Sequence, residues 1–275
     1  MSIALYRKYR PKTFNDISGQ APIVQTLRNQ VISGKASHAY LFHGLRGSGK
    51  TSIARIFAKA VNCSNPVNGN PCGQCEHCNY ANDVNPDIIE IDAASNNSVD
   101  NIRQLIEEVQ YKPTNNKYKV YIIDEVHMLS GSAFNALLKT IEEPPEHAIF
   151  ILATTELLKV PATIRSRCQI FCFKSLVLDE IKSKLKEILS QENINYFGED
   201  ALDFIAEQSD GSMRDAISLL DQCIANHSEP IDLLMPQLIT LQELRDLFGE
   251  VNREVIEKLV DCISNSNVKE GINIS

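Results

Sequence analysis

With 275 residues, of which 43% are hydrophobic and 23% charged, the chain has the composition of a globular protein of about one to three domains. No apolar run approaches the roughly 20 residues that cross a bilayer, and the first ten residues lack the apolar core of a signal peptide, so we expect a cytoplasmic protein without a membrane partner. The net charge of −8 is uneven, because residues 1–60 carry ten lysines and arginines against Asp16 alone, an excess that suits a polyanionic ligand.

Residues 44–51 form a complete phosphate-binding loop of the G-x-x-x-x-G-K-[ST] type. Its glycines allow backbone N–H groups to surround a triphosphate, Lys50 can place its charge on the outer phosphates, and the Thr51 hydroxyl can bind Mg²⁺. An expected buried strand over 39–43 leads into the loop and an expected helix over 51–62 leaves it, which argues against a chance glycine-rich turn. The predicted ATP contacts are Gly44, Leu45, Arg46, Gly47, Ser48, Gly49, Lys50, Thr51 and Ser52.

Four of the eight cysteines follow that helix closely, in the order Cys63, Cys72, Cys75 and Cys78. Two C-x-x-C half-turns of this kind are typical of tetrahedral Zn²⁺ bound by four thiolates, a closed and therefore structural site. His77 is a rival fourth ligand, and an iron–sulfur cluster or disulfides are weaker alternatives. We expect residues 65–71 to be a flexible loop that allows Cys63 to complete the site, and the four scattered cysteines to be small buried hydrophobes.

The rest of the first half alternates between expected strands and helices. Continuously apolar strands between amphipathic helices predict a parallel sheet that is covered on both faces. Strands are expected at 88–92, 119–124, 148–154 and 169–173, and helices at 98–110 and 130–143.

Asp124 and Glu125 complete the second half of an ATPase site. The strand over 119–124 delivers them to the sheet edge where the phosphate-binding loop lies. Asp124 can hold Mg²⁺, directly or through water, and Glu125 can orient and polarise a water for in-line attack on the γ-phosphate. We interpret His127 as a local hydrogen-bonding residue without a catalytic role.

Three further polar residues are candidates for sensing or stabilising the γ-phosphate. Thr155 follows the strand over 148–154 beside Asp124, so its hydroxyl could bind the attacking water. Arg167 lies at the rim of the sheet, where a permanently charged guanidinium could reach the γ-phosphate of a neighbouring subunit. Arg214 opens a helix of the second domain and could read bound nucleotide across the domain junction.

The pattern becomes purely helical after a boundary near residues 174–176. Helices are expected at 178–191, 198–208 and 212–225, followed by a polar break at 226–230 and two further helices at 241–248 and 252–263. The last two are too few to form a domain alone.

Together these motifs resemble AAA+ ATPases, and more narrowly the gamma/tau family of bacterial DNA polymerase III clamp-loader ATPases. The resemblance covers roughly residues 4–225. Its specific parts are the four-cysteine insertion and Ser166-Arg167-Cys168, since phosphate-binding loops alone occur in many families. The other matching segments are 9–14, 44–51, 124–129, 135–140, 142–145, 152–155 and 211–215.

The resemblance implies an α/β AAA+ phosphate-loop ATPase with a parallel sheet, an inserted zinc module and a small all-helical lid domain. It implies that Arg10, Pro11 and Ile17 line the adenine pocket. Thr155 would be the first nucleotide sensor and Arg214 the second, and Arg167 would act in trans on the neighbouring subunit's ATP. The domains would be the ATPase domain at 1–174 with the zinc insertion at about 63–80, the lid at 175–228, and a linker with the start of a truncated helical collar at 229–275.

The family relationship also implies the activity and the partners. The cofactors would be ATP, Mg²⁺ and Zn²⁺. The partners would be the other subunits of a hetero-pentameric loader, the sliding clamp, primer–template DNA and the DNA polymerase III core. A non-hydrolysing stator or a zinc-dependent DNA-binding scaffold is the main alternative, but a stator would normally have a broken phosphate-binding loop. A helicase is a weaker alternative, because a helicase would need a second α/β lobe after residue 174, where the sequence pattern is purely helical.

Overall fold

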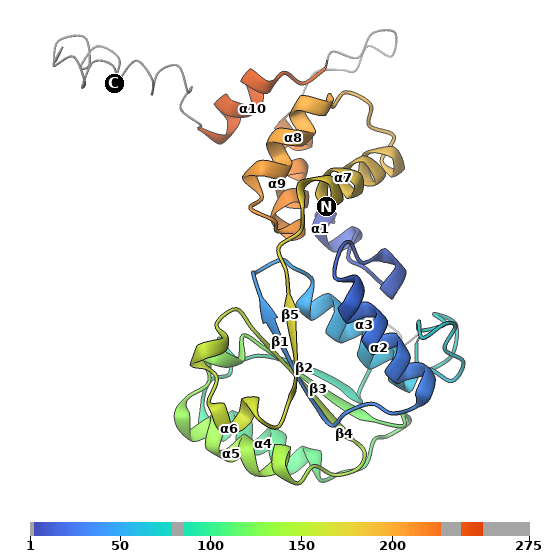
Figure 1. The fold of residues 1–275 in the computed structure, drawn as a ribbon, viewed down its shortest axis with the longest axis vertical. Coiled ribbons are helices and arrows are strands. Elements are labelled where there is room, and N and C mark those ends of the chain that lie inside the picture. Colours follow the sequence, from blue (N-terminus) through green and yellow to red (C-terminus); the bar gives the residue numbers. More distant parts are fainter. Residues whose placement is uncertain (1–2, 79–84, 227–237, 250–275) are drawn as a thin grey trace, which may run out of the picture.

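The computed structural model describes residues 3–78, 85–226 and 238–249, which form a sheet-containing part below a purely helical part (Figure 1). None of the helices in these ranges is long and apolar enough to span a membrane. The elements are α1 (Leu5–Lys8), η1 (Phe14–Asp16), α2 (Ala21–Ser33), β1 (Ala39–Gly44), α3 (Lys50–Asn62), β2 (Ile88–Asp92), α4 (Val99–Val109), β3 (Lys119–Asp124), η3 (Val126–Met128), α5 (Gly131–Glu142), β4 (Ala148–Thr154), η4 (Leu157–Lys159), α6 (Ala162–Arg165), β5 (Gln169–Phe173), α7 (Leu178–Gln191), α8 (Glu199–Gln208), α9 (Met213–Asn226) and α10 (Leu241–Phe248).

The five strands form one sheet in the order β2-β3-β4-β1-β5, and every neighbouring pair is parallel. The predicted parallel sheet is therefore confirmed. Each connection between parallel strands must cross over the sheet, and the helices that make these crossings cover both faces.

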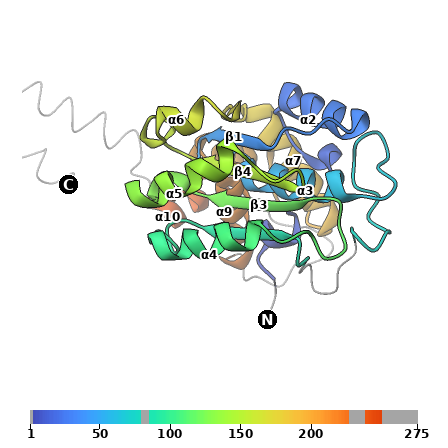
Figure 2. The same ribbon diagram turned by 90° about the horizontal axis from the view of Figure 1, so that it is seen from below.

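Alternation along β1 shows how the sheet is buried on both sides. Tyr40 and Phe42 face the hydrophobic core beneath α2 and α3, where the Tyr40 ring meets Phe57 edge-on at 5.0 Å between centroids. Ala39 and Leu41 face the opposite core, beneath α4 and α5. These two helices lie side by side in both views (Figures 1 and 2).

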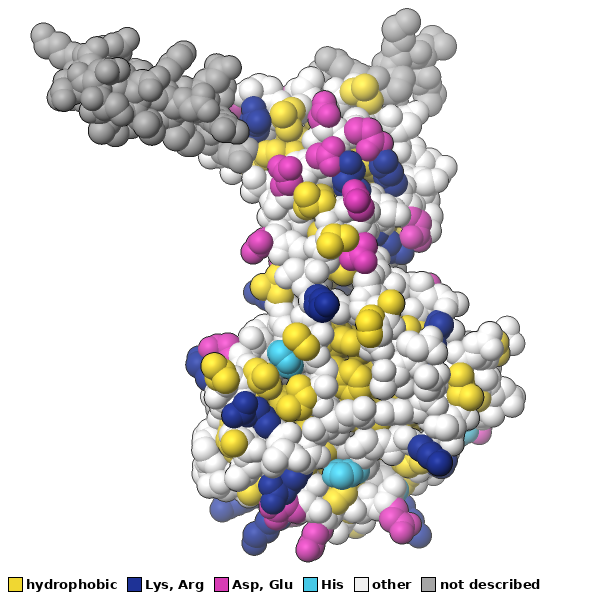
Figure 3. Space-filling view, in the orientation of Figure 1, with side chains coloured by type: hydrophobic (Ala, Val, Ile, Leu, Met, Phe, Trp, Pro, Cys, Tyr) yellow, Lys and Arg dark blue, Asp and Glu magenta, His cyan; other side chains and the backbone are white. Residues whose placement is uncertain are grey.

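In the helical part of the molecule, hereafter the lid, helices α7, α8 and α9 pack around a core of their own, and α10 adds Leu244 to this core. The lid surface carries mixed charges (Figure 3), and ion pairs join α7 to α8, with Lys182 Nζ 2.5 Å from Asp203 and Lys186 Nζ 2.6 Å from Glu199. Exposed pairs of this kind contribute little to stability, because solvent screens them. The buried apolar faces of the helices therefore hold the lid together.

The N-terminal segment belongs to both parts of the molecule. Helix α1 packs on the lid, where the backbone N–H of Leu5 donates to Asp221 Oδ2 at 3.1 Å and Lys8 Nζ lies 2.5 Å from Glu192 Oε1. The chain then crosses to the sheet-containing part, and Phe14 is buried in the core under α2. Neither α1 nor α2 is among the helices expected from the sequence.

The scattered cysteines, which we expected to be buried, differ in their exposure. Cys223 is buried and Cys168 partly buried, but Cys172 is exposed, because on the edge strand β5 it lies on the face opposite to the buried Phe171 and Phe173; Cys262 lies outside the described residues. The polar break at 227–230, the helix at 252–263 and most of the expected collar segment lie outside the described residues.

Candidate active site

The carboxyl ends of the strands meet at one edge of the sheet, and the predicted nucleotide residues follow the strands there. His43 near the end of β1 pairs in register with Thr154 of β4. In open parallel sheets, ligands bind outside this edge. The fold brings the phosphate-binding loop, Asp124, Glu125 and Thr155 to it.

The phosphate-binding loop turns through left-handed backbone at Gly47 (φ 76°) and Gly49 (φ 101°), which favours glycine at both positions. It encloses Lys50, which is 5% exposed. Lys50 Nζ donates to the carbonyl oxygens of Gly44 and Leu45, each at 2.9 Å. The loop is thus closed around its own lysine.

Two opposing effects act on the pKa of Lys50. Burial is the larger effect and lowers the pKa overall, whereas the negative charges of Glu125 and Asp124 oppose it. The lysine therefore lies within the field of the two carboxylates predicted to act on the nucleotide. A phosphate oxygen is a stronger partner for a buried cation than a neutral carbonyl, so the arrangement suits an exchange of one for the other.

The remaining predicted loop residues differ in their accessibility. Ser48 is buried, and its hydroxyl donates to the Leu45 carbonyl at 2.7 Å. Arg46 and the side chain of Leu45 are exposed, and Ser52 is half-buried in the first turn of α3.

The two predicted Mg²⁺ ligands are already in contact. The Thr51 hydroxyl donates to Asp124 Oδ2 at 2.7 Å. The other carboxylate oxygen of Asp124 accepts from the backbone N–H of Glu125 at 2.9 Å. Mg²⁺ is usually bound by one or two protein oxygens together with phosphates and water, so this pair fits the ion.

Glu125 is held by Thr155, which follows β4. Glu125 adopts left-handed backbone at φ 46°, and its Oε2 accepts from the Thr155 hydroxyl at 3.1 Å and from the Thr155 N–H at 3.3 Å. A strained backbone at a residue of this kind is typical of functional sites. Glu125, the candidate base, is thus directly hydrogen-bonded to Thr155, the candidate sensor.

His127 makes the local hydrogen bonds that the sequence predicts. Its Nδ1 lies 3.0 Å from Thr154 Oγ1 and 3.4 Å from Glu125 Oε2, and its Nε2 lies 3.3 Å from Glu156 Oε1. The side chain is 7% exposed. The imidazole is therefore buried in contact with Glu125, Thr154 and Glu156, and the sequence alone does not reveal these contacts.

Arg167 follows α6 and is occupied within its own chain. Its Nη2 lies 2.7 Å from Glu142 Oε1 at the end of α5, and its Nη1 donates to the Thr163 carbonyl at 2.8 Å. Both members of the ion pair are 38% exposed. Neither partner belongs to the phosphate-binding loop. The contacts of Arg167 therefore do not connect it to the ATP site of its own chain.

The lid reaches the phosphate-binding loop through the start of α9. A Cβ added at Gly47 would lie 2.0 Å from Ser212 Oγ and 3.3 Å from Arg214 Cβ. The exposed Arg214 guanidinium lies 5.2 Å from the centroid of the Tyr6 ring. Arg214 thus lies beside the loop, and Ser212, which sequence reasoning did not single out as a contact, touches it.

Gly47→Ala is expected to destabilise the protein by about 1–3 kcal/mol and to weaken ATP binding, because the new methyl group combines backbone strain with overlap on Ser212. Thermal unfolding and ATP titration measure both effects. Gly34→Ala is the matched control, since Gly34 has a similar φ of 65° with open space around it. Equal losses in the two variants would contradict a role for the Ser212 contact.

The residues implied for the adenine pocket lie on the N-terminal segment. Arg10 and Pro11 are half-buried, and Ile17 packs against the core beneath α2 and α3. The pKa of Arg10 is lowered, mainly by burial, and the charges that act on it include Arg214 and Asp124. Arg10 therefore lies near the other site residues.

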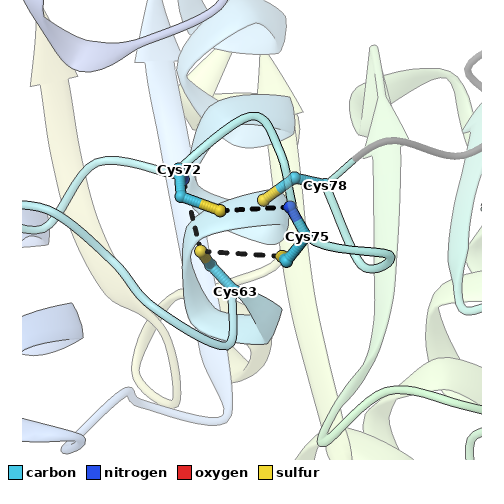
Figure 4. A group of neighbouring side chains, drawn as sticks. All are labelled: Cys63, Cys72, Cys75 and Cys78. Atoms are coloured by element: carbon cyan, nitrogen blue, oxygen red, sulfur yellow. Dashed lines mark hydrogen bonds between the residues drawn. The ribbon is translucent and has the colours of Figure 1, made fainter.

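The four predicted metal ligands converge after α3 (Figure 4). All four sulfurs lie within 4.8 Å of one another, and the backbone N–H of Cys72 donates to Cys63 Sγ at 3.2 Å. Tetrahedral Zn²⁺ with Zn–S distances of about 2.3 Å places sulfurs about 3.8 Å apart, so the set fits the ion. Although burial raises it, hydrogen bonds from the Ser64 backbone and the neighbouring thiols lower the pKa of Cys75 to about 6. His77 is not a member of this cluster.

The segment 65–71, expected to be a flexible loop between the first two cysteines, contains a tight turn. Val67 and Asn70 exchange backbone hydrogen bonds of 3.0 and 2.9 Å around Asn68 and Gly69. Both central residues have positive φ, as in the Asn-Gly turns of hairpins. The Asn68-Gly69 dipeptide is the sequence signal from which this turn could have been predicted.

Two family models match the chain. One, described as "DNA polymerase III, delta subunit", covers residues 19–177, and the other, described as "DNA polymerase III clamp loader subunit, ATPase lid domain", covers residues 180–229. The matches follow the order of the sheet-containing part and the lid.

Curated relatives and solved structures agree with this assignment. DNA polymerase III subunit tau of Bacillus subtilis is 49% identical over 98% of this chain and 46% of its own length, and the tau subunit of Escherichia coli is 50% identical over 96% of this chain and 40% of its own length. The chain thus spans less than half of these relatives. The RuvB Holliday junction branch migration motor of Thermotoga maritima has a TM-score of 0.63 at 19% identity, covering 94% of this chain and 80% of that one, which supports the AAA+ fold alone. The chain belongs to the clamp-loader subunits of DNA polymerase III and corresponds to the N-terminal AAA+ ATPase portion of the gamma/tau subunits.

Proposed function

We propose that this chain is an ATP-hydrolysing motor subunit that loads the sliding clamp on primed DNA during replication. The observation that carries the proposal is the convergence of Lys50, Thr51, Asp124 and Glu125 at one edge of the sheet. A non-hydrolysing stator would have no need of an intact set of these groups.

Each of these residues would have a distinct role in the transfer of the γ-phosphoryl group to water. MgATP supplies the γ-phosphate and the metal charge. Lys50 would exchange the carbonyls of Gly44 and Leu45 for phosphate oxygens, while Thr51 and Asp124 would hold the Mg²⁺. Arg10, Pro11 and Ile17 would line the adenine, and Arg214 would contact the phosphates from the lid.

Glu125 would orient and polarise the attacking water. In this structure its Oε2 is engaged by Thr155, so the carboxylate must exchange that bond for the water before hydrolysis. Thr155 would thereby couple the γ-phosphate to the state of the base. A site closed in this way binds nucleotide but hydrolyses it slowly.

Arg167 would act in trans within a hetero-pentamer. Its pairing with Glu142 leaves it on the surface, from which it would reach the ATP of a neighbouring subunit. The other partners in this proposal are the sliding clamp, primer–template DNA and the DNA polymerase III core.

ATP turnover by the chain alone, and then with the other loader subunits, clamp and primed DNA, tests the proposal. Slow turnover alone and strong stimulation in the mixture is the expected result. Equal rates in both, with the mass of the mixture showing that the chain has joined the assembly, would reject the motor function.

We also propose that the four-cysteine cluster holds a structural Zn²⁺. About one zinc per chain is expected, and chelation is expected to lower the thermal midpoint, because a closed thiolate site contributes folding energy directly. Atomic emission and thermal unfolding measure this. Cys75→Ser should reduce the zinc content, whereas Cys172→Ser, which alters an exposed cysteine outside the cluster, should retain it.

A further inference from the structure

The turn between the first two cysteines is anchored by the buried side chain of Asn70. Asn70 is 8% exposed, although its neighbour Val67 is 62% exposed. Its Oδ1 accepts the backbone N–H of Phe14 at 2.8 Å. The turn is therefore bonded to a segment 56 residues earlier in the chain.

The same turn is packed tightly on α2. A Cβ added at Gly69 would lie 3.0 Å from the Cα, the Cβ and the carbonyl oxygen of Arg28. The Arg28 guanidinium in turn lies 5.9 Å from the Phe14 ring centroid and donates to Asn15 Oδ1. The turn, α2 and residues 14–15 thus form one packed unit.

Asn70 supplies a partner that the N-terminal segment lacks. Phe14 is the first residue of the short helix η1, whose first N–H groups have no acceptor within the helix. Phe14 is also 2% exposed, so water cannot readily replace Asn70. Losing the acceptor would leave a buried donor unpaired and loosen the start of η1.

We propose that Asn70 is a positioning residue for nucleotide binding: it fixes the segment 10–17, so that the four-cysteine module sets the shape of the adenine pocket without touching the nucleotide. The inference rests on the proposed function, in which Arg10, Pro11 and Ile17 line the base. These residues flank Phe14 on both sides. The phosphate-binding loop is closed by the hydrogen bonds of Lys50 to Gly44 and Leu45, and Asn70 takes part in neither of them.

The experiment compares the affinity of the chain for ATP with its affinity for inorganic tripolyphosphate. Asn70→Ala is expected to weaken ATP binding about tenfold while leaving tripolyphosphate binding unchanged, since only the base contacts are loosened. Asn70→Asp keeps an oxygen acceptor for the Phe14 N–H and should restore most of the ATP affinity. Val67→Ala changes an exposed side chain of the same turn and is the control for both.

Unchanged ATP affinity in folded Asn70→Ala, or equal losses for ATP and tripolyphosphate, would overturn the inference. If Asn70→Ala does not fold by circular dichroism, the wild-type chain stripped of metal by a chelator takes its place: a loss confined to ATP supports the inference, and an unchanged ratio rejects it. A wild-type chain that binds ATP no better than tripolyphosphate would instead reject the adenine pocket itself.

Discussion

Arg167→Ala should lower the rate of ATP hydrolysis by the assembled loader about 10³-fold or more, because an arginine supplied in trans stabilises the charge that develops on the transferred phosphoryl group. ATP binding by the isolated chain should stay unchanged, since Arg167 contacts Glu142 and Thr163 rather than the loop. Single-turnover hydrolysis in the reconstituted complex, together with ATP titration of the isolated chain, measures both.

A second variant tests whether the ion pair between Arg167 and Glu142 matters for hydrolysis. Both side chains are 38% exposed, so releasing Arg167 costs about 0–1 kcal/mol and does not prevent its transfer to a neighbour. Glu142→Gln should therefore change hydrolysis by less than about fivefold. A loss in Glu142→Gln as large as that in Arg167→Ala would mean that the arginine acts through the fold of its own subunit.

Glu125→Gln should reduce hydrolysis by about 10²–10⁴-fold while ATP binding persists, since the amide keeps an oxygen for Thr155 but cannot polarise the water as a carboxylate does. Rapid-quench measurement of a single turnover separates this loss from slow product release. Glu143→Gln, which changes an exposed carboxylate beyond α5, is the matched control and should be close to wild type. Equal rates for Glu125→Gln and the control would rule out Glu125 as the group that activates water.

The strands of the core could be predicted because their apolar runs are continuous and their ends are marked by polar residues. β4 is buried along its whole length, and it lies where the sequence indicates. Helix α2 was not predicted because its N-cap residue Gln20 has left-handed backbone and no side-chain cap; the signals that the sequence did offer were Pro22 in the first turn and Gly34 just after the end. The four-residue α1 exists because the lid provides Leu5 with a buried surface and a hydrogen bond.

The candidate site shows the same division. The phosphate-binding loop, Asp124 and Glu125 could be read from local patterns, because each motif is a few residues long and follows a strand. The contacts of Glu125 with Thr155, and of Asn70 with Phe14, join residues 30 and 56 positions apart, and no local pattern encodes them.

The N-terminal segment makes the polypeptide pass between the lid and the sheet twice, once between α1 and η1 and once between β5 and α7. Only the connection from β5 to α7 joins the lid to the sheet covalently; at the other crossing, α1 is held on α9 by packing and by the hydrogen bond from Leu5 to Asp221. A movement of the lid relative to the sheet must therefore either carry α1 with it, and so pull on the chain between Tyr9 and Phe14, or detach α1 from α9. The residues of this short link thus receive any displacement of the lid directly.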